Sequence, residues 1–123
     1  PQLFRSKYKV EVFFKEKVTN EGAEHIMHQL ETQPLVKYAT LVTKEDALQI
    51  YQDEFGENVI EMLGDNPFPP SCIVKLQETN FSTTKLLSVT YGLKLSFTAQ
   101  DFSVSDISYP CKSQKNFVYS KSP

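Results

Sequence analysis

The chain has 123 residues, which is the size of one domain with a modest hydrophobic core of its own. Its net charge is −2 and Arg5 is its only arginine, so the basic, arginine-bearing face that nucleic-acid binding requires is missing. No apolar run approaches the ~20 residues of a membrane-spanning helix. Because the chain begins at proline rather than methionine, we expect it to be a piece of a longer protein.

The first two predicted elements are a strand and a helix. Apolar side chains alternate over residues 8–14, and Phe13 makes the second face partly apolar as well, which favours a central strand. Thr19 and Asn20 are good N-cap residues for a helix that Pro34 stops. Its apolar residues recur at the spacing of one helical stripe, namely Ala23, Ile26, Met27 and Leu30.

A second strand is predicted over residues 36–42, and two short helices follow it. Thr43 and Asp46 resemble a capping box at the start of the first helix, and Gly56 closes it. The second helix covers residues 57–63 and ends at the proline-rich run 64–70. One face of the first helix is predicted to hold Ala47, Leu48, Tyr51 and Phe55, and one face of the second Val59, Ile60 and Leu63, with Ile50 and Met62 off these stripes.

The remaining predicted elements are a strand over residues 72–76, an ambiguous segment over 82–97, and a strand over 104–109. Residues 87–97 alternate as a strand does, yet Leu86, Val89, Leu93 and Phe97 also fit a helical stripe. The tail 111–123 is polar with one apolar patch at 117–119, and its place in the fold is not predicted.

Candidate catalytic and metal-binding residues are few. His25 and His28 lie three residues apart on the first helix, but they project away from its apolar stripe, and no third strong ligand is visible. Cys72 opens a sheet strand, where a buried cysteine behaves as a small hydrophobe rather than a nucleophile. We therefore expect no catalytic residues, no metal and no cofactor.

Apolar surface is the remaining candidate for function. Eight apolar residues lie in and beside the two short helices, and two such helices bury only one stripe each, so some of the eight should stay exposed. The alternative is that they pack only on one another and on the core. The predicted partner-binding residues are Ile50, Tyr51, Phe55, Val59, Ile60, Met62, Leu63 and Phe68. Of these, Phe55, Ile60, Met62 and Leu63 are expected to form an exposed cluster rimmed by Glu57, Glu61 and Asp65.

The same region carries a family resemblance. The runs 34–48 (PLVKYATLVTKEDAL) and 63–71 (LGDNPFPPS), with the strand YKVEVFF at 8–14 before them, resemble the large extracytoplasmic domain of the FtsX-type bacterial cell-division permease. The resemblance is good over residues 8–76, thin over 77–103, and weak at 104–110. It implies a helix over 82–97, which the residues alone leave undecided.

The element order then predicts an α+β fold with a ferredoxin-like split βαβ core (βαββαβ, porter-like). Residues 1–42 and 71–123 would form this core, and residues 43–70 a helical lobe inserted between strands two and three. In the strand order 4-1-3-2 of that fold, Cys72 and Cys111 lie at opposite ends of the sheet. Because a disulfide needs Cα atoms within about 7 Å, we expect both thiols to be unbridged.

The resemblance also implies a function. The chain would be the extracytoplasmic (periplasmic or extracellular) domain of an ABC-transporter-like permease in the bacterial plasma membrane. It would act as a protein-binding module, with membrane helices flanking both of its ends. Its partners would be a murein hydrolase or hydrolase activator and, through the membrane part, a cytoplasmic FtsE-type ATPase. A ferredoxin-like small-molecule regulatory or sensor domain is the alternative, and a small hydrolase would need a residue cluster that is not found.

Overall fold

A computed structural model describes residues 8–99 and 103–111 of the chain. The predicted element types and their order are confirmed, including the helix over 82–97 and the split βαβ, ferredoxin-like arrangement. The elements are β1 (Lys9–Phe14), α2 (Asn20–Glu31), β2 (Val36–Val42), α3 (Lys44–Phe55), α4 (Val59–Leu63), β3 (Ser71–Leu76), α5 (Thr83–Ala99) and β4 (Val104–Ser108).

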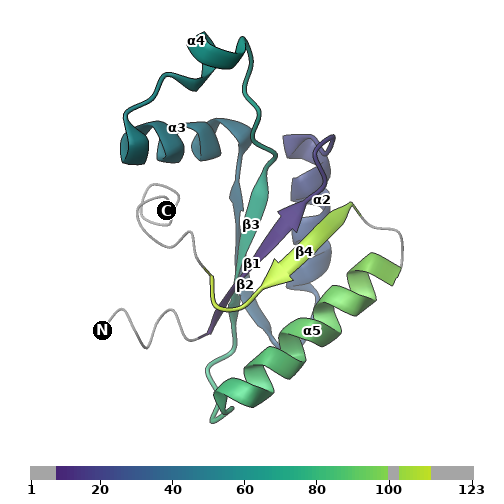
Figure 1. Cartoon of the computed structure of the whole chain (residues 1–123). Coiled ribbons are helices and arrows are strands. Elements are labelled where there is room, and N and C mark those ends of the chain that lie inside the picture. The colour runs from purple at the N-terminus through teal and green to yellow at the C-terminus, as the bar shows by residue number, and fades with distance from the viewer. Residues whose placement is uncertain (1–7, 100–102, 112–123) are drawn as a thin grey trace.

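The four strands form one antiparallel sheet in the order β2-β3-β1-β4, as predicted. In the pairing of β1 with β3, Val10 lies opposite Val74, and β4 pairs with the other edge of β1. The β2–β3 pair closes with Val42 opposite Ser71, and the two lobe helices are inserted between these two residues. The lobe therefore projects from one end of the sheet, while β1 begins and β4 ends at the other (Figure 1).

Helices α2 and α5 cover one face of the sheet and form the main core with it (Figure 1). The α2 stripe is confirmed, since Ala23, Ile26 and Leu30 are buried and Met27 packs against them. Alternate residues of the central strands point into this layer, which places valine side chains of β1 and β3 at its centre. The buried residues of the core are Val10, Val12, Phe14, Ala23, Ile26, Leu30, Val36, Cys72, Val74, Leu76, Leu86, Phe97, Val104 and Ile107.

The inward face of α5 differs from the predicted one by one position. Leu86 and Phe97 are buried and Leu93 packs on the core, but Thr90 is buried in place of Val89, which is only half-buried. The spacing 86, 90, 93, 97 follows the 3.6-residue period of a helix, and a choice made on apolar residues alone passes over a threonine. The Thr90 hydroxyl is satisfied within the helix, because it donates to the Leu86 carbonyl at 2.8 Å.

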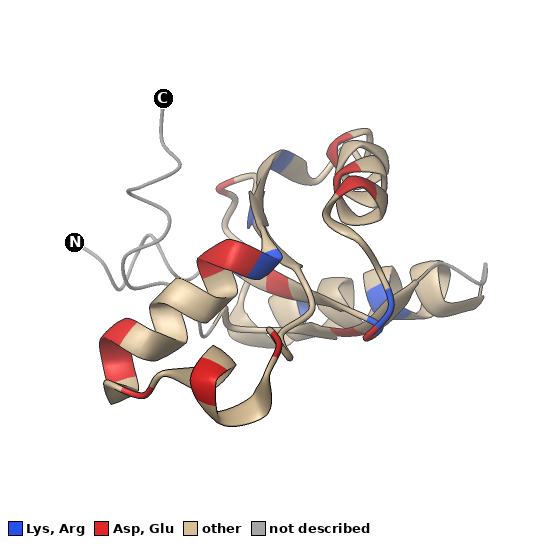
Figure 2. Cartoon of the chain, turned by 90° about the horizontal axis from the view of Figure 1, so that it is seen from above, with Lys and Arg blue, Asp and Glu red and all other residues tan. Residues whose placement is uncertain are grey.

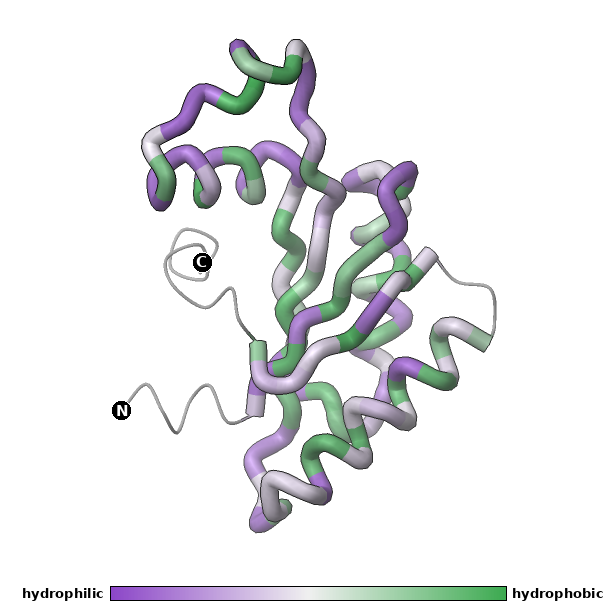
Figure 3. The backbone as a smooth tube through the Cα atoms, in the orientation of Figure 1, coloured by the Kyte–Doolittle hydropathy of each residue, from purple (hydrophilic) through white to green (hydrophobic). Residues whose placement is uncertain are grey.

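The outward face of α5 is apolar as well. Leu87, Tyr91 and Leu95 follow one another at intervals of four residues and are exposed. Green, hydrophobic segments accordingly lie on both sides of α5 in the hydropathy view (Figure 3).

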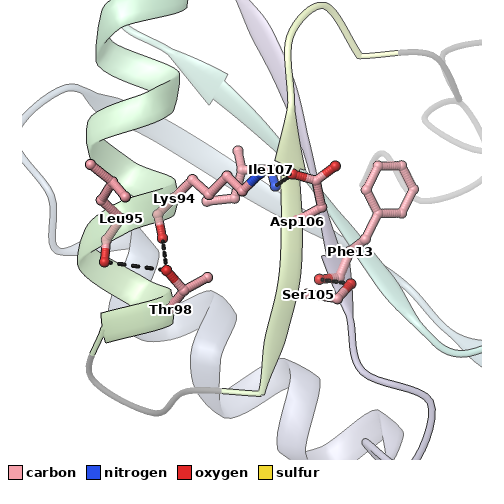
Figure 4. A network of polar contacts seen from close by, with 7 residues as sticks. All are labelled: Phe13, Lys94, Leu95, Thr98, Ser105, Asp106 and Ile107. Carbon is pink, nitrogen blue, oxygen red and sulfur yellow. Dashed lines mark hydrogen bonds and ion pairs between the residues drawn. The ribbon is translucent and has the colours of Figure 1, made fainter.

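Polar contacts hold α5 and β1 to the edge strand β4 (Figure 4). Lys94 forms an ion pair with Asp106 at 3.0 Å, and the Ser105 hydroxyl donates to the Phe13 carbonyl at 3.1 Å. Both Lys94 and Asp106 are substantially exposed, so this pair contributes little to stability. It fixes the position of the helix relative to the edge strand rather than supplying the driving force of the fold.

A smaller cluster lies on the opposite face of the sheet. It consists of buried Val42, Ile73 and Cys111, with Ala47 and Ile50 of α3 packed against them. Cys72 and Cys111 are both buried and unbridged, which confirms the prediction for the two thiols. Apart from Cys111, the tail 111–123 lies outside the described residues.

Candidate functional site

The lobe is built from short helices with strong end signals. At the start of α3 the capping box is complete: the Asp46 amide donates to Thr43 Oγ1 at 3.0 Å, and the Thr43 amide to Asp46 Oδ2 at 3.1 Å. Gly56 ends the helix with φ +68°, the left-handed conformation that favours glycine. The helix α4 has only five residues. Its N-cap is Asn58, whose side-chain oxygen accepts a hydrogen bond from the Glu61 amide.

The lobe contacts the sheet through few apolar residues. No residue of α3 is fully buried, and only Ala47 and Ile50 reach the cluster of Val42, Ile73 and Cys111. Ile50 was predicted to lie off the stripe that contains Ala47, yet both residues pack on this cluster. Phe55 is exposed, as predicted. In Figure 1, α3 starts at the end of β2 and runs away from the sheet, which agrees with the contacts of Ala47 and Ile50 in its first half.

An aromatic group joins α3 to the exit from the lobe. The ring centroids of Tyr51 and Phe55 are 4.7 Å apart, and those of Tyr51 and Phe68 are 5.1 Å apart, both in tilted arrangements. The Tyr51 hydroxyl donates to Glu57 Oε2 at 3.1 Å, and this hydrogen bond to a carboxylate raises the pKa of Tyr51. The side chain of Tyr51 thus links α3 to the start of the α3–α4 connection and to the exit from the lobe.

Four large apolar side chains of the lobe are exposed to solvent. The exposed fraction is 58% for Phe55, 45% for Ile60, 67% for Met62 and 63% for Leu63. By contrast Val59 is 4% exposed, because a helix of five residues turns only part of its surface inward. Of the eight predicted partner-binding residues, these four are therefore accessible. Tyr51 and Phe68 are half-buried, Ile50 packs on the sheet cluster, and Val59 is buried.

The exposed residues lie in an acidic region. Residues 43–70 contain seven acidic residues and one lysine, a net charge of −6 in a chain whose total is −2. Acidic segments of α3 and α4 are coloured red in Figure 2, where they lie on both lobe helices. Glu57, Glu61 and Asp65 are all exposed, and they adjoin the four apolar side chains in the sequence.

Polar side chains join the lobe to the core, and sequence reasoning missed them. Asn20, the first residue of α2, accepts from the Lys44 amide at 2.9 Å and donates to Glu45 Oε1 at 2.9 Å. At the exit from the lobe, Asn66 donates to the Lys44 carbonyl at 2.9 Å, and Lys44 Nζ donates to the Phe68 carbonyl at 3.1 Å. No periodicity marks such contacts, because their partners are 22 to 25 residues apart along the chain.

The other candidate sites offer no chemistry among the described residues. His28 contacts Glu31 at 3.1 Å on an exposed helix face, and the described part of the chain holds no cluster of three metal-ligating side chains. Burial raises the pKa of Cys72 to about 12, which suppresses the thiolate that a nucleophile would need. The pockets found over described residues are open and lined largely by charged and polar residues, among them Glu16, Lys44 and Asp65.

The fold and this surface define a class of protein: a ferredoxin-like domain carrying an inserted helical lobe with exposed apolar side chains. The family model of the FtsX extracellular domain matches residues 7–92, so the chain belongs to the FtsX extracellular domain family. It is thus an extracytoplasmic domain of a membrane protein, associated with the cell-division ABC permease. Within the described residues, no helix has the length and apolar character needed to cross a membrane.

A solved structure has the same fold. It is extracellular domain 1 of FtsX from S. pneumoniae in complex with undecyl-maltoside, with 17% sequence identity and a TM-score of 0.60. The match covers 83% of this chain and 93% of that one. Comparison with curated protein sequences gave no significant match.

Proposed function

We propose that the chain is a non-enzymatic binding module that docks a murein hydrolase or hydrolase activator through its lobe. The observation that carries the proposal is the group of four large apolar side chains, Phe55, Ile60, Met62 and Leu63, exposed within a segment of net charge −6. We call these four residues the docking surface. Exposed apolar groups bordered by charges are typical of protein-interaction sites.

The direction of the lobe supports this role. The strand β1 begins and β4 ends at one end of the sheet, and the lobe projects from the other (Figure 1). Membrane helices of a permease that join the chain at its two ends would therefore leave the lobe at the membrane-distal tip. A partner in the cell wall could reach the docking surface there without displacing the core.

The proposed coupling is mechanical. An FtsE-type ATPase would move the membrane helices, the sheet would follow through β1 and β4, and the lobe would carry the docked hydrolase or activator into its active arrangement.

The acidic rim of Glu57, Glu61 and Asp65 would speed encounter with a basic partner surface and make association salt-dependent. The apolar side chains of the docking surface would supply most of the affinity. The undecyl-maltoside in the pneumococcal structure shows that a domain of this fold accepts an alkyl glycoside, so binding should be measured without detergent.

The test is calorimetric binding of the cognate hydrolase or activator to the Met62→Glu and Ile60→Glu variants, alongside a thermal melt. An anchor worth about 2 kcal/mol corresponds to a loss of affinity of about 30-fold per variant. Leu87→Glu is the matched control, because Leu87 is an apolar residue on α5, away from the lobe, with an exposed fraction of 49%, close to the 45% of Ile60. Unchanged affinity in both lobe variants would move the site off the lobe, and a collapsed melt would make these residues part of the core.

A further inference from the structure

The attachment of the lobe to the core is mostly polar. Among the described residues, Ala47 and Ile50 are the side chains of α3 that pack on the sheet cluster, and no residue of α3 is fully buried. An apolar contact this small leaves the angle of the lobe weakly defined, because packing fixes orientation only where many side chains interdigitate. An open pocket lined by Glu16, Lys44, Leu63, Asp65, Asn66 and Pro67 lies between the β1–α2 connection and the lobe, so there is space for the lobe to tilt.

Lys44 is the point where three segments meet. Its amide donates to Asn20 Oδ1 at 2.9 Å, its carbonyl accepts from Asn66 Nδ2 at 2.9 Å, and its Nζ donates to the Phe68 carbonyl at 3.1 Å. Asn66 also accepts from the Phe68 amide at 2.9 Å, which fixes the turn that leaves the lobe. The start of α2, the start of α3 and the exit from α4 are therefore connected through one residue.

One end of this connection is rigidly placed and the other leads to the docking surface. Asn20 belongs to α2, whose Ala23, Ile26 and Leu30 are buried against the sheet. At the other end, the Phe68 ring packs on Tyr51, and the Tyr51 ring packs on Phe55. Asn20 thus stands at the core end of a continuous series of contacts that reaches an exposed residue of the docking surface.

We propose that Asn20, Lys44 and Asn66 are positioning residues that hold the lobe at a fixed angle to the core. This inference rests on the proposed function, because a lobe that transmits motion of the core must be joined to it stiffly. With the links intact, movement of α2 or the sheet carries the docking surface with it. Without them, the lobe tilts about its two chain connections and the movement is lost.

The test is nuclear magnetic resonance of the chain with weakly aligned samples. In the wild type, the residual dipolar couplings of the lobe amides (44–63) and of the sheet and α2 amides should fit one alignment tensor. In the double variant Asn20→Ala/Asn66→Ala, the lobe couplings should shrink relative to those of the core and require a tensor of their own. Asn80→Ala is the matched control, since Asn80 is exposed in the β3–α5 connection, and it should leave a single tensor.

A single tensor in the double variant would overturn the proposal. If that variant does not fold, Asn20→Ala alone provides the same test, because it removes the two hydrogen bonds from α2 to the lobe, those of Asn20 with the Lys44 amide and with Glu45 Oε1. The residual dipolar couplings are measured without the partner, so this test of lobe orientation is independent of the test of the proposed docking. With the partner present, a lobe that holds its orientation in about one third of molecules would bind about threefold more weakly.

Discussion

At the scale of single residues, one strongly perturbed group is a thiol in the core. Cys72 is fully buried in β3, and this burial raises its pKa from 9.0 to about 12. A nearby backbone hydrogen bond from Thr40 lowers the value, but by less than burial raises it. The side chain therefore acts as a small apolar residue, as expected of a cysteine that opens a central strand.

This pKa predicts how stability depends on pH at the alkaline end. Between pH 9 and 12 the unfolded chain loses the Cys72 proton while the folded protein keeps it, so the free energy of unfolding falls as pH rises. The contribution of this one group is about 1.4 kcal/mol per pH unit. Urea denaturation of the wild type and of Cys72→Ala, at several pH values in this window, measures it as the difference between the two slopes. Equal slopes would contradict the shift.

Individual residues of the lobe were the hardest to place from the sequence. The exposure of Phe55, Ile60, Met62 and Leu63 follows from the excess of apolar residues on two short helices and is confirmed, whereas the packing of Ile50 on the sheet was not predicted. Ile50 packs on the sheet because of the angle at which α3 leaves the end of β2, and that angle is a tertiary property without a sequence period. The links of Lys44 to Asn20 and Asn66 are invisible to sequence for the same reason.

At the scale of elements, the residues that cap helices were the most reliable predictors of structure in the sequence. Thr19, Thr43 and Gly56 mark helix ends that the structure confirms, because a cap depends on local geometry alone. The segment 82–97 could not be decided from its own residues, since its apolar positions satisfy both a two-residue and a 3.6-residue period. The family resemblance identified it as a helix, and the structure confirms that.

Two glycines of these helices predict opposite effects of the same substitution. Gly56 has φ +68°, so Gly56→Ala should destabilise the C-terminal end of α3 by about 1 kcal/mol. Gly92 lies inside α5, where an added Cβ would meet nothing within 4 Å, so Gly92→Ala should stabilise the protein by about 0.5–1 kcal/mol.

Chemical denaturation gives the effect of Gly92→Ala, and amide hydrogen exchange of α3 resolves that of Gly56→Ala, which acts on the lobe. The two variants serve as controls for each other, since the added methyl group is the same. A destabilising Gly92→Ala would mean that this position on the outward face of α5 is occupied in the folded protein by something beyond the described contacts.

At the scale of the whole molecule, the division into a core and a lobe follows from the register of the sheet. Val42 and Ser71 are directly paired at the end of the β2–β3 ladder, although 28 residues lie between them. The element order predicted the four-stranded sheet, because a split βαβ arrangement has few ways to pair its strands. The boundary of the lobe was predicted at 43 and 70, and the pairing makes that boundary testable.

Replacing residues 43–70 with Asn-Gly should leave a folded core. The pair Val42–Ser71 would then be joined by a two-residue turn of the kind that favours antiparallel hairpins. Loss of Ala47 and Ile50 uncovers Val42 and Ile73, which should lower stability by about 1–3 kcal/mol, while the β-sheet signal and a cooperative melt persist. Circular dichroism and calorimetric binding measure both consequences. A deletion variant that still binds the hydrolase or activator would place the docking site on the core, and one that cannot fold would make the lobe part of the same folding unit as the sheet.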